Sequence, residues 1–399
     1  MLARRRFLRA IAAAAIAGPA GALAGCAASW PALPDQLVLG FYVSWDPASR
    51  DSLARSVGQL THVAPEWLRL DLSEAGFVDM RTAADRSTVE PLMRSSRLPI
   101  LPLLNNFVPS GPGSRQRSWN GEIVGRRVSD PQARAALVAQ LRDYLLAQGW
   151  QGLVLDLEAL AEEDRDGLTA LVRELASTLH ASGLLLGQAV QQASPAFDLE
   201  RLADHADFLV PMLYDEHWAE GEPGSIAGAA WSDSQLARLF ARVPSQKVVL
   251  GLGNYGYDWS AGVPARSVGF STAVAQARQA QVSSGGREGR IALDPATLNP
   301  TYSYTASDGT VRTVWLLDAA TAYNQWTLAR QHRPRGAALW RLGAEDPAVW
   351  EVIGRGTIDG SAGSSATVER LQAAGEVRRS FTFDSRTGLI VGGTYAVEG

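Results

Sequence analysis

The sequence predicts an α/β fold: a (β/α)8 TIM barrel with a small α+β insertion between the seventh and eighth strands. From residue 36 onward, short apolar runs with strand character alternate with helical patterns of period 3.6. The chain has 399 residues, which accommodates one barrel of about 250 residues and extra segments. Charged residues make up 20% and hydrophobic residues 46%, as in an ordinary globular protein.

Eight strands are expected, and a helical pattern follows most of them. One helix begins at Asp130 and Pro131, an N-cap followed by a proline at the first helical position, and ends before Gly149. Residues 106–129 read as a long polar loop. The expected strands cover 36–45, 60–70, 98–105, 150–158, 184–192, 207–214, 247–253 and 336–341, and further helices cover 168–179, 199–206, 232–243 and 318–331.

The barrel is expected to occupy residues 36–353, with the insertion at about 258–317. Within the insertion, residues 301–316 predict a hairpin that turns at Asp308 and Gly309. Residues 354–366 are rich in Gly and Ser and read as a linker. The last segment, 367–399, has a pattern for a short helix and a hairpin, and its role is unknown.

Residues 1–25 read as a signal peptide rather than as part of the fold. Arg4, Arg5 and Arg6 resemble a twin-arginine export signal, and the apolar stretch 11–24 is short for a membrane span. It ends in Leu23-Ala24-Gly25-Cys26, which resembles a bacterial lipobox and predicts lipidation of Cys26. The alternative is a small-residue cleavage site with an incidental cysteine. We expect an exported, membrane-anchored lipoprotein at the outer membrane or the periplasmic face. By analogy with lipoproteins, Ala27 and Ala28 after the cysteine favour the outer membrane over retention in the inner membrane.

Composition disfavours several other classes of function. The formal net charge of -4 provides no basic field for nucleic acid. Cys26 is the only cysteine, so no disulfide forms within the chain. No Gly-x-Ser-x-Gly motif supports a serine hydrolase, and no cofactor is implied. No metal site is expected, because no pair of histidines has ligand spacing among His62, His180, His205, His217 and His332.

The most informative stretch is the expected strand 150–158. Side chains alternate along a strand, so Asp156 and Glu158 project from the same face, about 7 Å apart. Like charge and burial would raise the pKa of one of them, which keeps a carboxylic acid protonated near neutral pH. The alternative is a solvated acidic loop at the strand end.

Residues 37–350 resemble glycoside hydrolase family 18, the chitinase-like barrels. The family ends its fourth strand with Asp-x-x-Asp-x-Asp-x-Glu, and the same register here reads Gln151, Val154, Asp156 and Glu158. Residues 212–215, 251–259 and 338–343 resemble the family motifs of strands six, seven and eight. Residues 64–67 and 103–106 are most similar to the spore cell-wall and exopolysaccharide-associated branches.

The resemblance implies a glycosidase that cleaves β-linked N-acetylglucosamine polymers, whether chitin-like, peptidoglycan or exopolysaccharide. Its mechanism would be retaining and substrate-assisted, with Glu158 as the general acid. Asp156 would orient and stabilise the acetamido group, and Tyr214 would donate a hydrogen bond to it. Substrate contacts are expected from Asp215, Met212, Trp340, Tyr42, Trp45 and Asn105.

Two alternatives stay open at this point. Tyr214 and Trp340 would be core residues if the family motif were ignored. Gln151 and Val154 depart from the full motif, which leaves a non-catalytic carbohydrate-binding barrel as the second reading of the chain.

Overall fold

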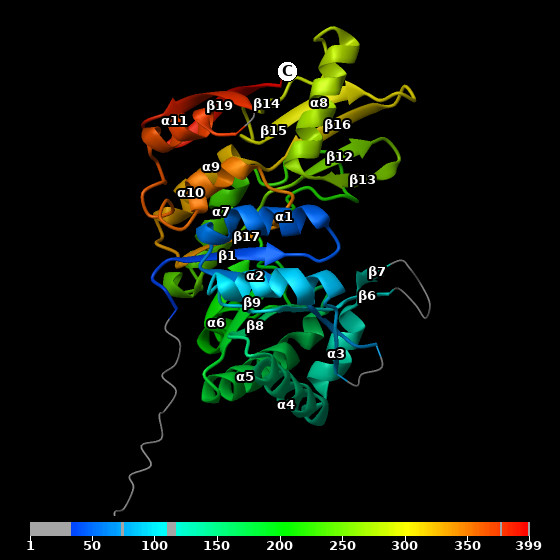
Figure 1. Cartoon of the computed structure of the whole chain (residues 1–399), viewed down its shortest axis with the longest axis vertical. Helices are drawn as coiled ribbons and strands as arrows, with labels where there is room; N and C mark the ends of the chain where they lie inside the picture. Colours follow the sequence, from blue (N-terminus) through cyan, green and yellow to red (C-terminus); the bar gives the residue numbers. More distant parts are fainter. Residues whose placement is uncertain (1–32, 73–75, 110–116, 376, 398–399) are drawn as a thin grey trace, which may run out of the picture.

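The computed structural model describes residues 33–72, 76–109, 117–375 and 377–397 (Figure 1). The expected signal peptide and Cys26 lie outside these residues. Within them, eight of the parallel strands lie in two sheets. One sheet has the order β11-β17-β1-β2, and the other begins β10-β9-β8-β5 and continues through β3 (Leu68–Leu70) to β4 (Phe77–Asp79). Isolated parallel bridges pair Val63 with Ile100 and Leu209 with Val248, where the sheets adjoin. The strands are β1 (Leu37–Tyr42), β2 (His62–Pro65), β5 (Leu103–Asn105), β8 (Gly152–Asp156), β9 (Leu185–Val190), β10 (Phe208–Pro211), β11 (Val249–Gly253) and β17 (Gly336–Trp340).

One apolar cluster, which we call the inner cluster, lies between these strands. Each of the eight strands contributes at least one buried side chain to it, including Leu39, Ala64, Leu103, Val154, Leu185, Phe208, Val249 and Ala338. Because alternate residues of a strand face the same way, the next inward position after Val154 is Asp156, at the carboxyl end of β8. The prediction of parallel strands in an α/β fold is confirmed.

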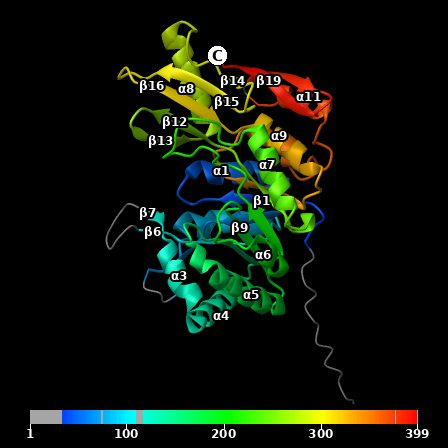
Figure 2. The ribbon, with the colours of Figure 1, turned by 180° about the vertical axis from the view of Figure 1, so that it is seen from behind.

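Helices cover the outside of the strands (Figure 2). They are α1 (Pro47–Ser56), α2 (Glu90–Ser95), α3 (Gly121–Ser129), α4 (Pro131–Gln148), α5 (Arg165–Ala181), α6 (Leu199–His205), α7 (Ala229–Phe240), α9 (Ala319–Arg330) and α10 (Trp350–Ile353). In α4 the Asp130 side chain accepts a hydrogen bond from the Gln132 amide, and Gly149 ends the helix with a φ of 66°. No helix among the described residues is long and apolar enough to cross a membrane.

The expected polar loop at 106–129 is wrong in its second half. Residues Gly121–Ser129 form α3, which Asn120 caps by accepting from the Ile123 amide. Two glycines weaken the helical signal of this stretch, but Ile123, Val124 and Val128 lie on one buried face. The first half contains the short antiparallel pair β6 (Phe107–Pro109) and β7 (Arg117–Trp119). The expected strand 60–70 is also divided, into β2 and β3 (Leu68–Leu70), and β3 pairs with β4 (Phe77–Asp79).

The insertion is α+β, as expected, and begins at Gly256. It contains β12 (Gly256–Ser260), β13 (Val263–Val268), α8 (Phe270–Ser284), β14 (Ala292–Leu293), β15 (Pro300–Thr305) and β16 (Val311–Leu316). The β15–β16 hairpin turns at the predicted position, where Gly309 has a φ of 84°. Buried side chains of α8, such as Phe270 and Ala273, pack against β15 and β16.

The C-terminal segment is part of the same sheet (Figure 1). It contains α11 (Ser365–Ala373), β18 (Arg378–Asp384) and β19 (Leu389–Ala396), and Ala292 of β14 pairs with Thr394 of β19. The expected linker, 354–366, is a series of turns in which Ile358 and Ser361 are buried. It therefore packs on the strands and helices before it and does not separate two domains.

Buried polar contacts hold this segment in place. The Arg379 guanidinium lies 2.7 Å from the Asp346 carboxylate, and both side chains are almost completely buried. The Tyr395 hydroxyl donates to Asp318, and the Asn324 side chain makes two hydrogen bonds with the Ile390 backbone. Such contacts are specific, because each buried polar group needs its partner.

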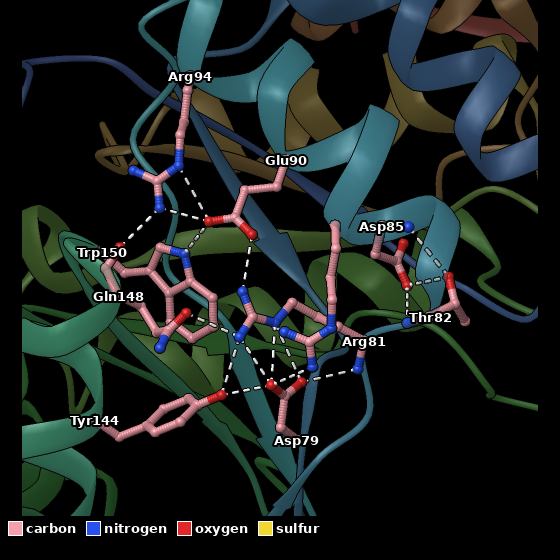
Figure 3. A network of polar contacts seen from close by, with 10 residues as sticks. Asp79, Arg81, Thr82, Asp85, Glu90, Arg94, Tyr144, Gln148 and Trp150 are labelled. Carbon is pink, nitrogen blue, oxygen red and sulfur yellow. Dashed lines mark hydrogen bonds and ion pairs between the residues drawn. The ribbon is translucent and has the colours of Figure 1, made fainter.

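A second polar network supports the strand that carries the candidate acids (Figure 3). Arg81 contacts Asp79 and Glu90, each at 2.8 Å, and its guanidinium lies 4.7 Å from the Trp150 ring. The Trp150 indole donates to Glu90 at 3.1 Å. Trp150 lies two residues before the start of β8, so this network fixes the position of the chain where that strand begins.

Candidate active site

The candidate site lies at the carboxyl ends of the parallel strands, beginning with Asp156. Asp156 is the last residue of β8, and only 6% of its surface is exposed. Burial, and then the negative charge of Glu66, raise the pKa of its carboxyl to about 7. Asp156 is therefore poised to gain or lose a proton near neutral pH.

Glu158 lies two residues beyond Asp156 and is held from both sides. The Asn106 side chain makes two hydrogen bonds with the Glu158 backbone, at 2.8 and 2.9 Å. The Gln191 amide donates to the Glu158 carboxyl at 2.7 Å. Burial, followed by the charges of Asp156 and Asp215, raises the pKa of Glu158 to about 9. Glu158 therefore keeps its proton at neutral pH, as a general acid must.

Glu66 brings a further carboxylate to the site from the end of β2. It follows the inner-cluster residue Ala64 by two positions. Its two oxygens accept hydrogen bonds from the Trp45 indole and the Asn105 amide, each at 2.8 Å. Burial raises the pKa of Glu66, and these two donors oppose the increase because they favour the charged form.

Tyr214 and Asp215 follow β10 and lie beside the acids. Burial and the charges of Asp156, Asp215 and Glu158 raise the pKa of Tyr214 well above its usual value, so its hydroxyl stays a donor. The Asp215 carboxylate accepts hydrogen bonds from the hydroxyls of Tyr255 and Tyr257, the latter at 3.1 Å. Burial raises the pKa of Asp215, although these two donors oppose the increase.

Two tryptophans flank the acids. Trp340 is the last residue of β17; it is half-buried and packs edge-on against Phe41 at a ring separation of 5.5 Å. Trp45 is 60% exposed, and the Arg341 guanidinium lies 4.2 Å from its ring. The exposed ring of Trp45 is held at a fixed position by its hydrogen bond to Glu66.

The structure brings most of the expected site residues together, with one exception. Tyr42 points away from the inner cluster: its hydroxyl donates to Asp85 at 2.8 Å, and its ring packs against Trp67. It alternates with Phe41, which faces inward, so the expected substrate contact of Tyr42 is wrong. Met212 is half-buried beside Gly251 of β11, at the same end of the strands.

Glu66, Gln191, Tyr255 and Tyr257 were not among the expected site residues. The alternation that starts at Ala64 was the available signal for Glu66. No such pattern marks Gln191, which lies in the loop after β9 and meets Glu158 only in the folded chain. No group of three or more potential metal ligands with suitable geometry occurs in the described part of the chain.

The fold and the site define an α/β protein with carboxyls of raised pKa at the carboxyl ends of parallel strands. The model of the glycosyl hydrolases family 18 matches residues 121–345. The chain belongs to this family. Proteins of the family are glycosidases that bind polysaccharide substrates.

Individual relatives agree with this assignment. The chain is 25% identical over 248 residues to the uncharacterized glycosylase YvbX of Bacillus subtilis, covering 60% of this chain and 71% of YvbX. It is 24% identical over 251 residues to the cortical fragment-lytic enzyme of Bacillus subtilis, covering 59% of this chain. It spans only 57% of the length of that enzyme.

Solved structures are similar over most of the chain. A chitinase from Chromobacterium violaceum superposes with a TM-score of 0.70 at 25% identity, covering 85% of this chain and all of that one. The spore cortex-lytic enzyme SleL of Bacillus cereus has a TM-score of 0.69 at 19% identity, covering 79% of this chain and 73% of that one. The second likeness concerns the fold alone.

Proposed function

We propose that the protein is a retaining glycosidase that cleaves polysaccharides containing β-linked N-acetylglucosamine by a substrate-assisted mechanism. The observation that carries the proposal is the buried pair at the end of β8, in which the pKa of Asp156 is about 7 and that of Glu158 about 9. The names of the relatives, a chitinase and cortex-lytic enzymes, support a substrate that is chitin-like or derived from peptidoglycan; an exopolysaccharide has the same chemistry.

In the first step Glu158 gives its proton to the glycosidic oxygen as the bond to the anomeric carbon breaks. The acetamido oxygen of the same sugar bonds to that carbon, which forms a cationic oxazolinium ring. Asp156, when ionised, faces the positive charge and accepts the acetamide N–H, while Tyr214 donates to the acetamide oxygen. Water then attacks the anomeric carbon, the bond from this carbon to the acetamido oxygen breaks, and the water gives a proton to Glu158.

The remaining site residues hold the substrate. Trp340 provides an apolar floor for the sugar, and Trp45 provides an exposed ring beside it. Asp215 and Met212 lie next to Tyr214 and contact the sugar in this proposal. Asn105 has its amide committed to Glu66, so it acts through that carboxylate.

We also propose that the two parallel sheets form one closed (β/α)8 barrel. The bridges at both sheet edges and the inner cluster support this arrangement. Lipidation of Cys26 would anchor the barrel to a bacterial membrane facing the periplasm or at the outer membrane; the lipobox-like sequence supports it.

The test is release of reducing ends from soluble N-acetylglucosamine oligomers by the purified protein and by Glu158→Gln. Release by the native protein and its loss in the variant agree with the proposal. Binding without release by the native protein would favour the alternative, a non-catalytic carbohydrate-binding barrel. The protonated Glu158 beside Asp156 is the feature that a purely binding protein would not need.

A further inference from the structure

A row of inward-facing side chains extends from Asp156 toward the edge of the sheet. Asp156 pairs in register with Asn105 of β5, and Asn105 pairs in register with Arg69 of β3. Residues in register on neighbouring strands point to the same face. Strands lie about 4.8 Å apart, so the Arg69 backbone is about 10 Å from that of Asp156. A polysaccharide that was bound at Asp156 and extended across β5 would therefore reach Arg69.

The Arg69 guanidinium carries a donor that the folded protein does not use. Its Nη1 atom is buried and has no hydrogen-bond partner among the described residues. The ion pairs found in the described ranges include neither Arg69 nor Arg117 of the neighbouring hairpin strand β7. A buried charged donor without an acceptor is unfavourable. This atom is therefore suited to donate a hydrogen bond to an acceptor that a ligand provides.

Arg117 brings a second positive charge to the same corner. Arg117 lies on β7, which pairs with β6, and β6 contacts β3, the strand that carries Arg69. Burial, and then the charge of Arg117, lower the pKa of Arg69. Asp71 and Glu66 act on Arg69 in the opposite direction. Glu66 accepts hydrogen bonds from Trp45 and Asn105, and it makes none with Nη1 of Arg69, which has no partner among the described residues.

We propose that Arg69 and Arg117 bind a carboxylate group of the substrate. The proposal rests on the glycosidase function proposed above and narrows its substrate class: a polysaccharide in which a sugar near the cleaved N-acetylglucosamine carries a carboxylate. A planar guanidinium matches a carboxylate with two parallel hydrogen bonds, which a neutral sugar does not offer. A lactyl ether on the sugar and a uronic acid both supply this group.

The test compares matched substrates that differ only in charge. The first pair is a soluble glycan oligomer of alternating N-acetylglucosamine and its lactyl-ether derivative, as the free acid and as the methyl ester. The second pair is an oligomer of N-acetylglucosamine and a uronic acid, again as acid and ester. The quantity measured is the ratio of kcat/KM for the acid to kcat/KM for the ester.

We expect the native protein to prefer one of the acids over its ester by at least about tenfold, because charged hydrogen bonds are lost on esterification. The preferred acid identifies the source of the carboxylate. Arg69→Gln and Arg117→Gln each reduce the ratio toward one, and raised salt reduces it in the native protein. Arg142→Gln, which changes an exposed arginine on α4, serves as the control and keeps the native ratio.

The proposal is overturned if the acid-to-ester ratio of kcat/KM is near one in the native protein for both substrate pairs. It is also overturned if folded Arg69→Gln and Arg117→Gln both keep the ratio of the native protein. Arg117 is exposed, so its variant folds even where Arg69→Gln does not. If no glycan is cleaved, the proposed glycosidase function is refuted, and this result alone does not decide the carboxylate proposal. The ratio of dissociation constants for the same acid and ester pairs, measured on the intact protein, then decides the carboxylate proposal by the same criteria.

Discussion

The substitution Glu66→Gln tests whether the charge of Glu66, which follows β2, raises the pKa of Asp156 at the end of β8. Glu66 is the charged group that adds to burial in raising the pKa of Asp156 to about 7. The substitution keeps the shape of the side chain and removes its charge. One of the hydrogen bonds from Trp45 and Asn105 is lost, because an amide group offers a single acceptor oxygen.

The expected size of the effect follows from the causes of the shift. A neighbouring like charge shifts a carboxyl pKa by about 1 to 3 units, and here burial is the larger cause, so we expect a decrease of about 1 unit in the pKa of Asp156. One unit corresponds to about 1.4 kcal/mol. Asp156 must be ionised and Glu158 protonated, so activity rises with pH near 7 and falls near 9. In Glu66→Gln the rise moves to lower pH, while the fall stays near its native position.

The measurement is kcat/KM against pH at constant ionic strength, on a soluble N-acetylglucosamine oligomer. Circular dichroism and thermal unfolding establish that the variant is folded. Glu163→Gln, which neutralises an exposed acid near the start of α5, is the matched control. It should change neither the rise nor the fall of kcat/KM with pH. If the rise of kcat/KM with pH occurs at the same pH in folded Glu66→Gln as in the native protein, Glu66 does not influence the ionisation that governs turnover.

Four other substitutions test separate parts of the structure. Glu158→Gln should lower kcat on unactivated oligomers at least about a hundredfold while binding persists, and undiminished turnover would exclude Glu158 as the acid. Trp340→Ala should weaken oligosaccharide binding by about 1–3 kcal/mol in calorimetry with folding retained; unchanged affinity would return Trp340 to a core role. Arg379→Met should cost roughly 3–5 kcal/mol in urea unfolding, because it leaves the buried Asp346 carboxylate without its partner; a loss below about 1 kcal/mol would contradict this. Cys26→Ser should release the protein from membranes and abolish the mass added by lipid, and unaltered membrane association would disprove the anchor.

Local patterns predicted the elements that carry the site. The helix from Pro131 to Gln148 follows from its cap, its proline and its terminal glycine, all of which act within a few residues. The strand that ends at Asp156 follows from its apolar run and its position after that helix. The motifs at the ends of the later strands then indicated Tyr214, Asp215 and Trp340, which the structure places at the same end of the strands.

Features that depend on contacts between distant residues were not predictable in this way. Residues 354–366 have the composition of a linker, yet Ile358 and Ser361 are buried against earlier elements. The pairing of Arg379 with Asp346 joins segments that carry no mutual signal in the sequence. The outward direction of Tyr42, by contrast, follows from the local alternation along β1, in which Leu37, Leu39 and Phe41 occupy the inner cluster.

The departure at Val154 illustrates how a site is defined in space and not by one motif. An acid at this position would be fully buried in the inner cluster beside Leu103, whereas valine packs there without a polar group to satisfy. The carboxylate that influences the pKa of Asp156 comes instead from Glu66, which follows β2 and lies 90 residues earlier in the chain. Trp45 and Asn105 donate hydrogen bonds to Glu66, which favours the charged form and opposes the increase that burial causes in its pKa. An incomplete motif on β8 is therefore compatible with a complete set of ionisable groups around Asp156.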